Sequence, residues 1–139
     1  MGSVILFPAI SGPTPSEQYE QDYRFLNTDG HDVSTIVIKP YAEKSQYDWE
    51  YNLVKQPVII KESEHIIKIF KALKNVDAGG YSKQRIIWRC KVSVRLKSSV
   101  KETELEVTKY DKSGVMIMKL NQIYRCDELG TALEEAIKP

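Results

Sequence analysis

Residues 86–97, with the sequence IIWRCKVSVRLK, decide the fold because apolar and polar side chains alternate along them. The apolar face holds Trp88, Cys90, Val92, Val94 and Leu96, and the other face holds Arg89, Lys91, Ser93, Arg95 and Lys97. This period of two predicts a β-strand with one face in the core and the other in water. Residues 102–107, ETELEV, alternate in the same way with glutamates on the polar face. The short link between the two stretches predicts a hairpin.

A third stretch, VMIMKLNQIY at residues 115–124, follows a turn at 111–114 and completes a predicted three-stranded meander. We expect apolar residues to face each other and bases to face acids, because a slip of one residue would turn apolar side chains towards water. The predicted pairs are Lys97–Glu102, Arg95–Glu104, Val94–Leu105, Val92–Val107, Val107–Met118, Leu105–Leu120 and Glu106–Lys119. Such charge pairing weakens the field that would attract nucleic acid.

The other segments predict an order of ββαβββα. Residues 33–38 and 58–60 are strand-like, and the alternating residues 46–53, QYDWEYNL, predict a further strand. Apolar stripes at helical spacing predict helices over residues 63–75 and 127–137, with Ser63 and Asp127 as N-caps, and a short helix could begin near Pro15. We therefore predict an α+β fold with an antiparallel sheet of about five strands and two helices packed on one face. Residues 1–16 would form an irregular arm, and residues 17–139 a single α+β domain.

Composition bounds the classes of function. The 139 residues are 42% apolar and 28% charged, with a net charge of +1, as is ordinary for a soluble globular domain. A nucleic-acid-binding domain usually carries an excess or a patch of basic residues, so no nucleic-acid partner is expected. No window holds the roughly 18 apolar residues that a membrane span needs. The start of the chain, MGS, resembles a cloning remnant, so a natural leader could be absent from this sequence.

The two cysteines are predicted to remain unpaired. In the predicted register, Cys90 lies across the sheet from Met116, and ten extended residues separate Met116 from Cys126. That length spans roughly 33 Å, whereas a disulfide needs Cα atoms less than about 7 Å apart.

The candidate ligand-binding residues are aromatic. Tyr47, Trp49 and Tyr51 would lie on one strand face with Tyr41 nearby, and such a row could bind a sugar or a peptide. The alternative is that these rings cover a helix.

The histidines offer a second kind of site. His31 with Asp29 and Asp32, or His65 alone, could act as an acid or base in a small hydrolase. The same turn matches no calcium loop and has too few donors for zinc, and no phosphate loop or nucleophile elbow occurs. We therefore predict no catalytic residue, no metal ligand and no cofactor, and we regard an enzyme as the less favoured reading.

Three pieces of the chain resemble small α+β domains of bacterial cell-envelope proteins and lipoproteins of unassigned function. They are VSTIVIKP (33–40), VIIKESEHIIKIFKALKN (58–75) and IYRCDELGTALEEAI (123–137). The resemblance implies a non-catalytic binding or accessory domain outside the cytoplasm, and it assigns no role to any residue. The alternatives are a cytoplasmic inhibitor or immunity-type protein that binds a partner enzyme, and the hydrolase described above. A protein or glycan partner is compatible with the sequence, which leaves the compartment and the oligomeric state open.

Overall fold

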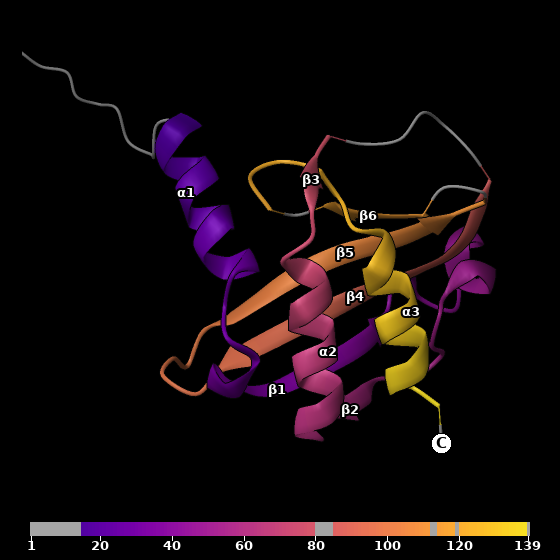
Figure 1. Ribbon diagram of the computed structural model, residues 1–139. Helices are drawn as coiled ribbons and strands as arrows, with labels where there is room; N and C mark the ends of the chain where they lie inside the picture. The colour runs from indigo at the N-terminus through magenta and orange to yellow at the C-terminus, as the bar shows by residue number, and fades with distance from the viewer. Residues whose placement is uncertain (1–14, 80–84, 112–113, 119, 139) are drawn as a thin grey trace, which may run out of the picture.

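The computed structural model describes residues 15–79, 85–111, 114–118 and 120–138, which build one antiparallel sheet with helices on one face (Figure 1). The sheet order is β2-β1-β4-β5-β6-β7-β3. The strands are β1 (Val33–Pro40), β2 (Val58–Ile60), β3 (Asp77–Ala78), β4 (Ile86–Leu96), β5 (Glu102–Tyr110), β6 (Gly114–Met118) and β7 (Tyr124–Arg125). The helices are α1 (Pro15–Leu26), α2 (Ser63–Leu73) and α3 (Asp127–Ala136), and two 3₁₀ turns are η2 (Gly30–Asp32) and η3 (Tyr47–Tyr51).

The predicted α+β class is confirmed. Five of the strands have three or more residues, which matches the expected number, whereas β3 and β7 have two residues each. Helix α1 is a third helix in addition to the two that the prediction packed on the sheet, and it begins two residues before the expected start of the domain. The rest of the predicted arm, residues 1–14, lies outside the described residues.

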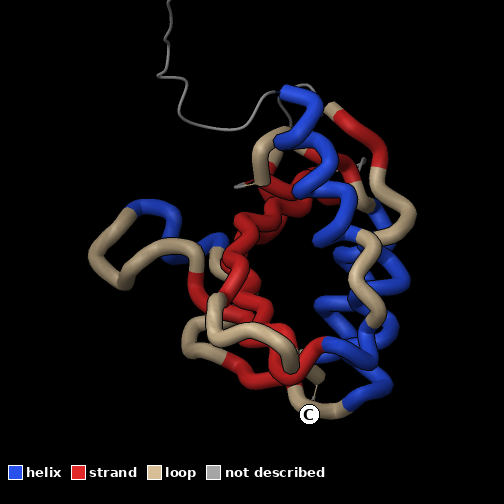
Figure 2. The backbone as a smooth tube through the Cα atoms, turned by 90° about the vertical axis from the view of Figure 1, so that its left-hand side faces the viewer, coloured by secondary structure: helices blue, strands red, loops and turns tan. Residues whose placement is uncertain are grey.

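The core lies between the sheet and the pair formed by α2 and α3 (Figures 1 and 2). The apolar stripe of α2 is buried as predicted, because residues spaced by three and four share one face of a helix. Its buried members are Ile66, Ile69, Phe70, Ala72 and Leu73. The rings of Phe70 and Phe25 meet edge to face at 5.9 Å, which joins the end of α1 to this layer. The helix caps differ from the prediction, since Glu62 and Cys126 occupy the N-cap positions and neither side chain caps.

Helix α1 is also held by a buried carboxylate. Asp22 is 2% exposed, and it accepts hydrogen bonds from the amides of Asn121 and Gln122 and from the hydroxyl of Tyr124. The side chain of Asn121 donates to the same carboxylate at 2.8 Å. Several donors around one buried carboxylate compensate for its lost hydration. Asp22 therefore ties α1 to the turn before β7.

The first hairpin has the predicted faces but a register that differs by two residues. Arg95 lies opposite Glu102 and Val92 opposite Leu105, so the predicted pairing of Arg95 with Glu104 is wrong. The physical reason is that Lys97 leaves the hairpin, and its backbone amide donates to the carbonyl of Asp32 at 2.8 Å. A shift of two residues keeps each side chain on its own face, so the buried set is unchanged.

The second hairpin differs from the prediction by one residue, so the predicted inward face of its last strand is wrong. Val107 lies opposite Ile117, and Val115 and Ile117 are buried. Both faces of this stretch carry apolar residues, so the alternation alone could not select one of them. The predicted pair of Glu106 with Lys119 is replaced by Glu106 opposite Met118, and Lys119 itself lies outside the described residues.

The two cysteines are free and buried, as predicted. The thiol of Cys126 donates to the carbonyl of Ala72 at 3.0 Å, which links α3 to α2. Burial raises the pKa of both the Cys90 and the Cys126 thiols to about 12. Each thiol is therefore a core group in the neutral form.

Candidate functional site

The segment between β1 and β2, residues 41–57, projects from the sheet face opposite to α2 and α3 (Figure 2). The strand predicted over residues 46–53 is wrong, because residues 47–51 form the 3₁₀ turn η3. The backbone of this stretch makes local hydrogen bonds instead, such as that from the amide of Asn52 to the carbonyl of Trp49 at 3.2 Å. We call residues 41–53 the aromatic loop.

Asn52 holds the aromatic loop in place. This side chain is 7% exposed, and its Oδ1 accepts hydrogen bonds from the amides of Tyr41 at 2.7 Å and Ala42 at 3.0 Å. Its Nδ2 donates to the carbonyl of Ala42 at 2.9 Å. The amide of Leu53 donates to the carbonyl of Arg89, which fixes the end of the loop to β4. The loop is therefore a defined surface that the sheet supports.

The four predicted aromatic residues all lie in this loop, but they do not form one row. The guanidinium carbon of Arg89 lies 3.8 Å from the ring centroid of Tyr41, and Lys55 Nζ lies 5.0 Å from that of Trp49. Tyr47 is 86% exposed and lies 6.4 Å from the half-buried ring of Tyr51. Cations therefore occupy one face of two of the rings, and Tyr47 is the ring most open to a partner.

A groove of about 520 Å³ lies between the aromatic loop and the open sheet face. Its lining residues are Tyr41, Ala42, Glu43, Gln46, Tyr47, Asp48, Lys91 and Glu106. The loop side of the groove is fixed by Gln46, whose Oε1 accepts a hydrogen bond from the amide of Glu43 at 2.7 Å. Asp48 Oδ2 lies 3.3 Å from Arg89 Nη1, which ties the same wall to the sheet.

The open sheet face presents bases beside acids. Lys39 lies 3.6 Å from Glu104, and Arg95 lies 3.4 Å from Glu102. These pairs are exposed or half-exposed, so each contributes about 1 kcal/mol or less to stability. Their main consequence is a face of mixed sign, whose long-range field is weaker than that of a basic patch.

The histidines contribute no shared site with the aromatic loop. His31 Nδ1 lies 2.8 Å from Asp29 Oδ1, and both side chains are largely exposed. Hydrogen bonds from the backbone and side chain of His31 lower the pKa of Asp29. His65 Nε2 lies 3.6 Å from Glu62, and neither histidine lines the groove beside the loop.

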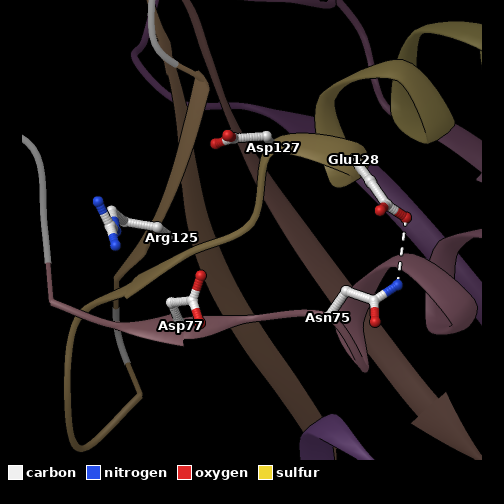
Figure 3. Close-up of a pocket in the computed structure, with 5 residues that line it drawn as sticks. All are labelled: Asn75, Asp77, Arg125, Asp127 and Glu128. Carbon is white, nitrogen blue, oxygen red and sulfur yellow. Dashed lines mark hydrogen bonds between the residues drawn. The ribbon is translucent and has the colours of Figure 1, made fainter.

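A second, polar pocket of about 240 Å³ lies where β3, β7 and the ends of α2 and α3 meet (Figure 3). Asn75, Asp77, Arg125, Asp127 and Glu128 line it, and the Asn75 side chain donates to Glu128 at 3.3 Å. The sequence analysis missed this pocket because two stretches distant in the sequence, residues 75–77 and 125–128, supply its lining, and no spacing within either stretch signals that they meet. Among the described residues, no group of three or more potential ligands could hold a metal ion.

None of the described helices has the length and apolar character needed to cross a membrane. No family model matches the sequence, and searches of curated proteins and of solved structures likewise found no match.

Proposed function

We propose that this protein is a non-catalytic protein-binding domain whose contact surface is the aromatic loop with the adjoining open sheet face. The observation that carries the proposal is that Tyr47 is 86% exposed on a loop of defined conformation. The side chain of Asn52 holds the backbone of this loop with three hydrogen bonds. Tyrosine is among the residues that contribute most to protein interfaces. A pre-ordered loop loses little conformational entropy when a partner binds. The cell-envelope setting implied by the resemblance belongs to this proposal.

A protein partner fits the loop better than a glycan does. Sugars bind on open aromatic faces, whereas Arg89 covers one face of Tyr41 and Lys55 lies over one face of Trp49. Protein interfaces combine an exposed aromatic centre with a polar rim. The mixed charges beside Tyr47 supply such a rim, since Glu43, Asp48 and Lys91 line the same groove.

The alternative is a cytoplasmic inhibitor or immunity-type protein, which would bind a partner enzyme through the charged open sheet face. Lys39 pairs with Glu104 and Arg95 pairs with Glu102 on that face. A partner enzyme with a complementary charged surface would associate quickly at low salt and more slowly at high salt.

The proposal is tested by affinity capture with matched variants. The immobilised protein, its Tyr47→Ser variant and its Val100→Ser variant are exposed to extract of the source cells, and retained proteins are identified by mass spectrometry. Val100 is a suitable control because it is 91% exposed in the turn after β4 and does not line the groove. We expect one protein to be retained by the wild type and by Val100→Ser but not by Tyr47→Ser.

A direct binding measurement on the purified pair then follows. The expected loss for Tyr47→Ser is about tenfold or more in affinity, the scale of an interface residue that contributes over 1 kcal/mol. Equal affinity of the wild type and Tyr47→Ser would refute the proposed surface.

A further inference from the structure

A cavity of about 240 Å³ lies between α1, the end of α2 and β3, and none of its described lining residues belongs to the aromatic loop (Figure 1). Aromatic and apolar side chains make up six of the eight described residues that line it. The eight are Tyr19, Tyr23, Leu26, Asn27, Lys74, Val76, Ala78 and Tyr124. Sites for drug-sized ligands occupy roughly 300–1,000 Å³. The cavity is smaller than these sites, so it fits a ligand with a single ring.

Hydrogen bonds behind the cavity fix its walls. The hydroxyl of Tyr124 donates to the carboxylate of Asp22 at 2.8 Å, which holds α1 against β7. Strand β3 pairs with β7, and Ala78 lies opposite Tyr124 in that pairing. The side chain of Asn27 donates to the carbonyl of Tyr23 at 2.9 Å, which fixes the end of α1. A ligand therefore meets a preformed site and has little backbone to order when it binds.

Two tyrosines of the cavity present exposed rings to it. Tyr19 and Tyr23 lie one turn apart on α1 and are 47% and 58% exposed. Helix α1 is anchored by other residues, since Asp22 binds Tyr124 and Leu26 is buried in the core. The exposed rings of Tyr19 and Tyr23 therefore supply aromatic area inside a concave site, where the ring of a ligand can pack.

Lys74 is the only charged side chain among the described residues that line the cavity. It takes part in none of the ion pairs found in the described part of the chain. Hydrogen bonds from His31 are the main cause of the lowered pKa of Asp29, and the charge of Lys74 adds only a small contribution from beyond ion-pair distance. The ammonium of Lys74 is therefore available to an anionic group of a ligand.

The acids closest in sequence to the lining residues do not line the cavity. Asp77 lies between Val76 and Ala78 on β3, and it lines the polar pocket of Figure 3 instead. Asp22 is 2% exposed, and its carboxylate already accepts four hydrogen bonds. A ligand in the cavity therefore meets one ammonium and no carboxylate among the described lining residues.

We propose that this cavity binds a small carboxylic acid with one aromatic ring, whose carboxylate contacts Lys74 and whose ring packs against Tyr19 and Tyr23. The site lies apart from the proposed protein-binding surface, so it adds a second binding activity. A carboxylate suits the cavity better than a phosphate, because one ammonium balances its single charge whereas a phosphate monoester carries about −1.5 to −2. An aromatic ring suits it better than an alkyl chain, because paired rings gain more than the area they bury.

The test uses 3-phenylpropionate as the probe and 3-phenylpropionamide as its neutral isostere. Each is titrated into the full chain while the ring signals of Tyr19 and Tyr23 are followed by NMR, with Tyr19→Phe and Tyr23→Phe used for assignment. We expect saturable shifts with a millimolar Kd, the scale for a ligand of about eleven non-hydrogen atoms. The amide should bind about threefold or more weakly than the acid, the scale of an exposed ion pair.

Two variants with matched controls locate the site. Lys74→Met should weaken 3-phenylpropionate by about threefold and leave the amide unchanged, whereas Lys71→Met, at an exposed position outside the cavity, should change neither. Tyr23→Ser should weaken both probes by about threefold or more, whereas Tyr47→Ser should change neither. All four positions are exposed, so these variants should fold as the wild type does. Absence of saturable shifts, equal affinity for the acid and the amide, or unchanged affinity in Lys74→Met or Tyr23→Ser would overturn the inference.

Discussion

Replacement of Asn52 by Ala should release the aromatic loop and lower the stability of the protein. The side chain is 7% exposed and makes three hydrogen bonds, two to amides and one to a carbonyl. Two of these partners belong to Ala42, which is 6% exposed, and the third is the amide of the half-buried Tyr41. Alanine cannot bind any of them, so polar backbone groups would be left in an apolar setting.

The size of the effect follows from these three groups. A buried polar group without a partner costs about 1–3 kcal/mol, and the amide of Tyr41 should cost least because water can reach it. We therefore expect a loss of about 3 kcal/mol in the free energy of unfolding. For a chain of 139 residues this corresponds to a fall of roughly 10 °C in Tm.

Urea unfolding followed by tryptophan fluorescence measures this loss, with Asn75→Ala as the matched control. Asn75 is exposed, and its side chain makes one hydrogen bond of 3.3 Å to Glu128, so the control should change stability by less than about 0.5 kcal/mol. A loss below about 1 kcal/mol for Asn52→Ala would refute the reasoning. It would mean that the loop is not held by this side chain.

Two further predictions concern groups away from the loop. At pH 8, a thiol reagent should label no cysteine in the native protein and two cysteines in urea. The reason is that burial raises the pKa of Cys90 and Cys126 to about 12. Rapid labelling of the native protein would contradict this prediction. Burial raises the pKa of Glu134, but the hydrogen bonds from Trp88 and Lys109 outweigh it, so the pKa lies below its usual 4.5. The stability that Glu134 contributes is therefore present above pH 4.5 and is lost as the pH falls through the lower folded value. Glu134→Gln should reduce the loss of stability at acidic pH by under about 1 kcal/mol, since the carboxylate is partly solvated. Urea midpoints measured over a series of pH values test this. The same acid-induced loss in the variant and the wild type would be evidence against a lowered pKa of Glu134.

The strand faces that strict alternation predicts are the part of the fold that local sequence determines. In β4, the apolar face of Trp88, Cys90, Val92 and Val94 is buried as predicted. The pairing between strands depends on contacts that the pattern does not contain. The amide of Lys97 donates to the carbonyl of Asp32, which is distant in the sequence, and the first hairpin ends with Arg95 opposite Glu102, two residues from the predicted register.

In the candidate site too, the sequence pattern indicated which residues lie close together but did not indicate their conformation. The sequence identified Tyr41, Tyr47, Trp49 and Tyr51, and they do lie together in one loop. Their conformation was mispredicted because alternation over a short segment does not show that a neighbouring strand pairs with it, and residues 47–51 instead close a 3₁₀ turn through local backbone hydrogen bonds. Asn52 gave no signal, since a side chain that binds backbone groups ten residues away has no characteristic spacing.

Oxidative footprinting of the partner complex tests the central proposal most directly. Hydroxyl radicals modify exposed tyrosines, and among the residues that the structure describes three have large exposed areas, Tyr19 at 47%, Tyr23 at 58% and Tyr47 at 86%. Binding of the captured protein should slow the oxidation of Tyr47 by about fivefold or more, because a residue at the centre of an interface is largely desolvated. Tyr19 and Tyr23 should react at unchanged rates. An unchanged rate at Tyr47 in the saturated complex would show that the partner binds elsewhere.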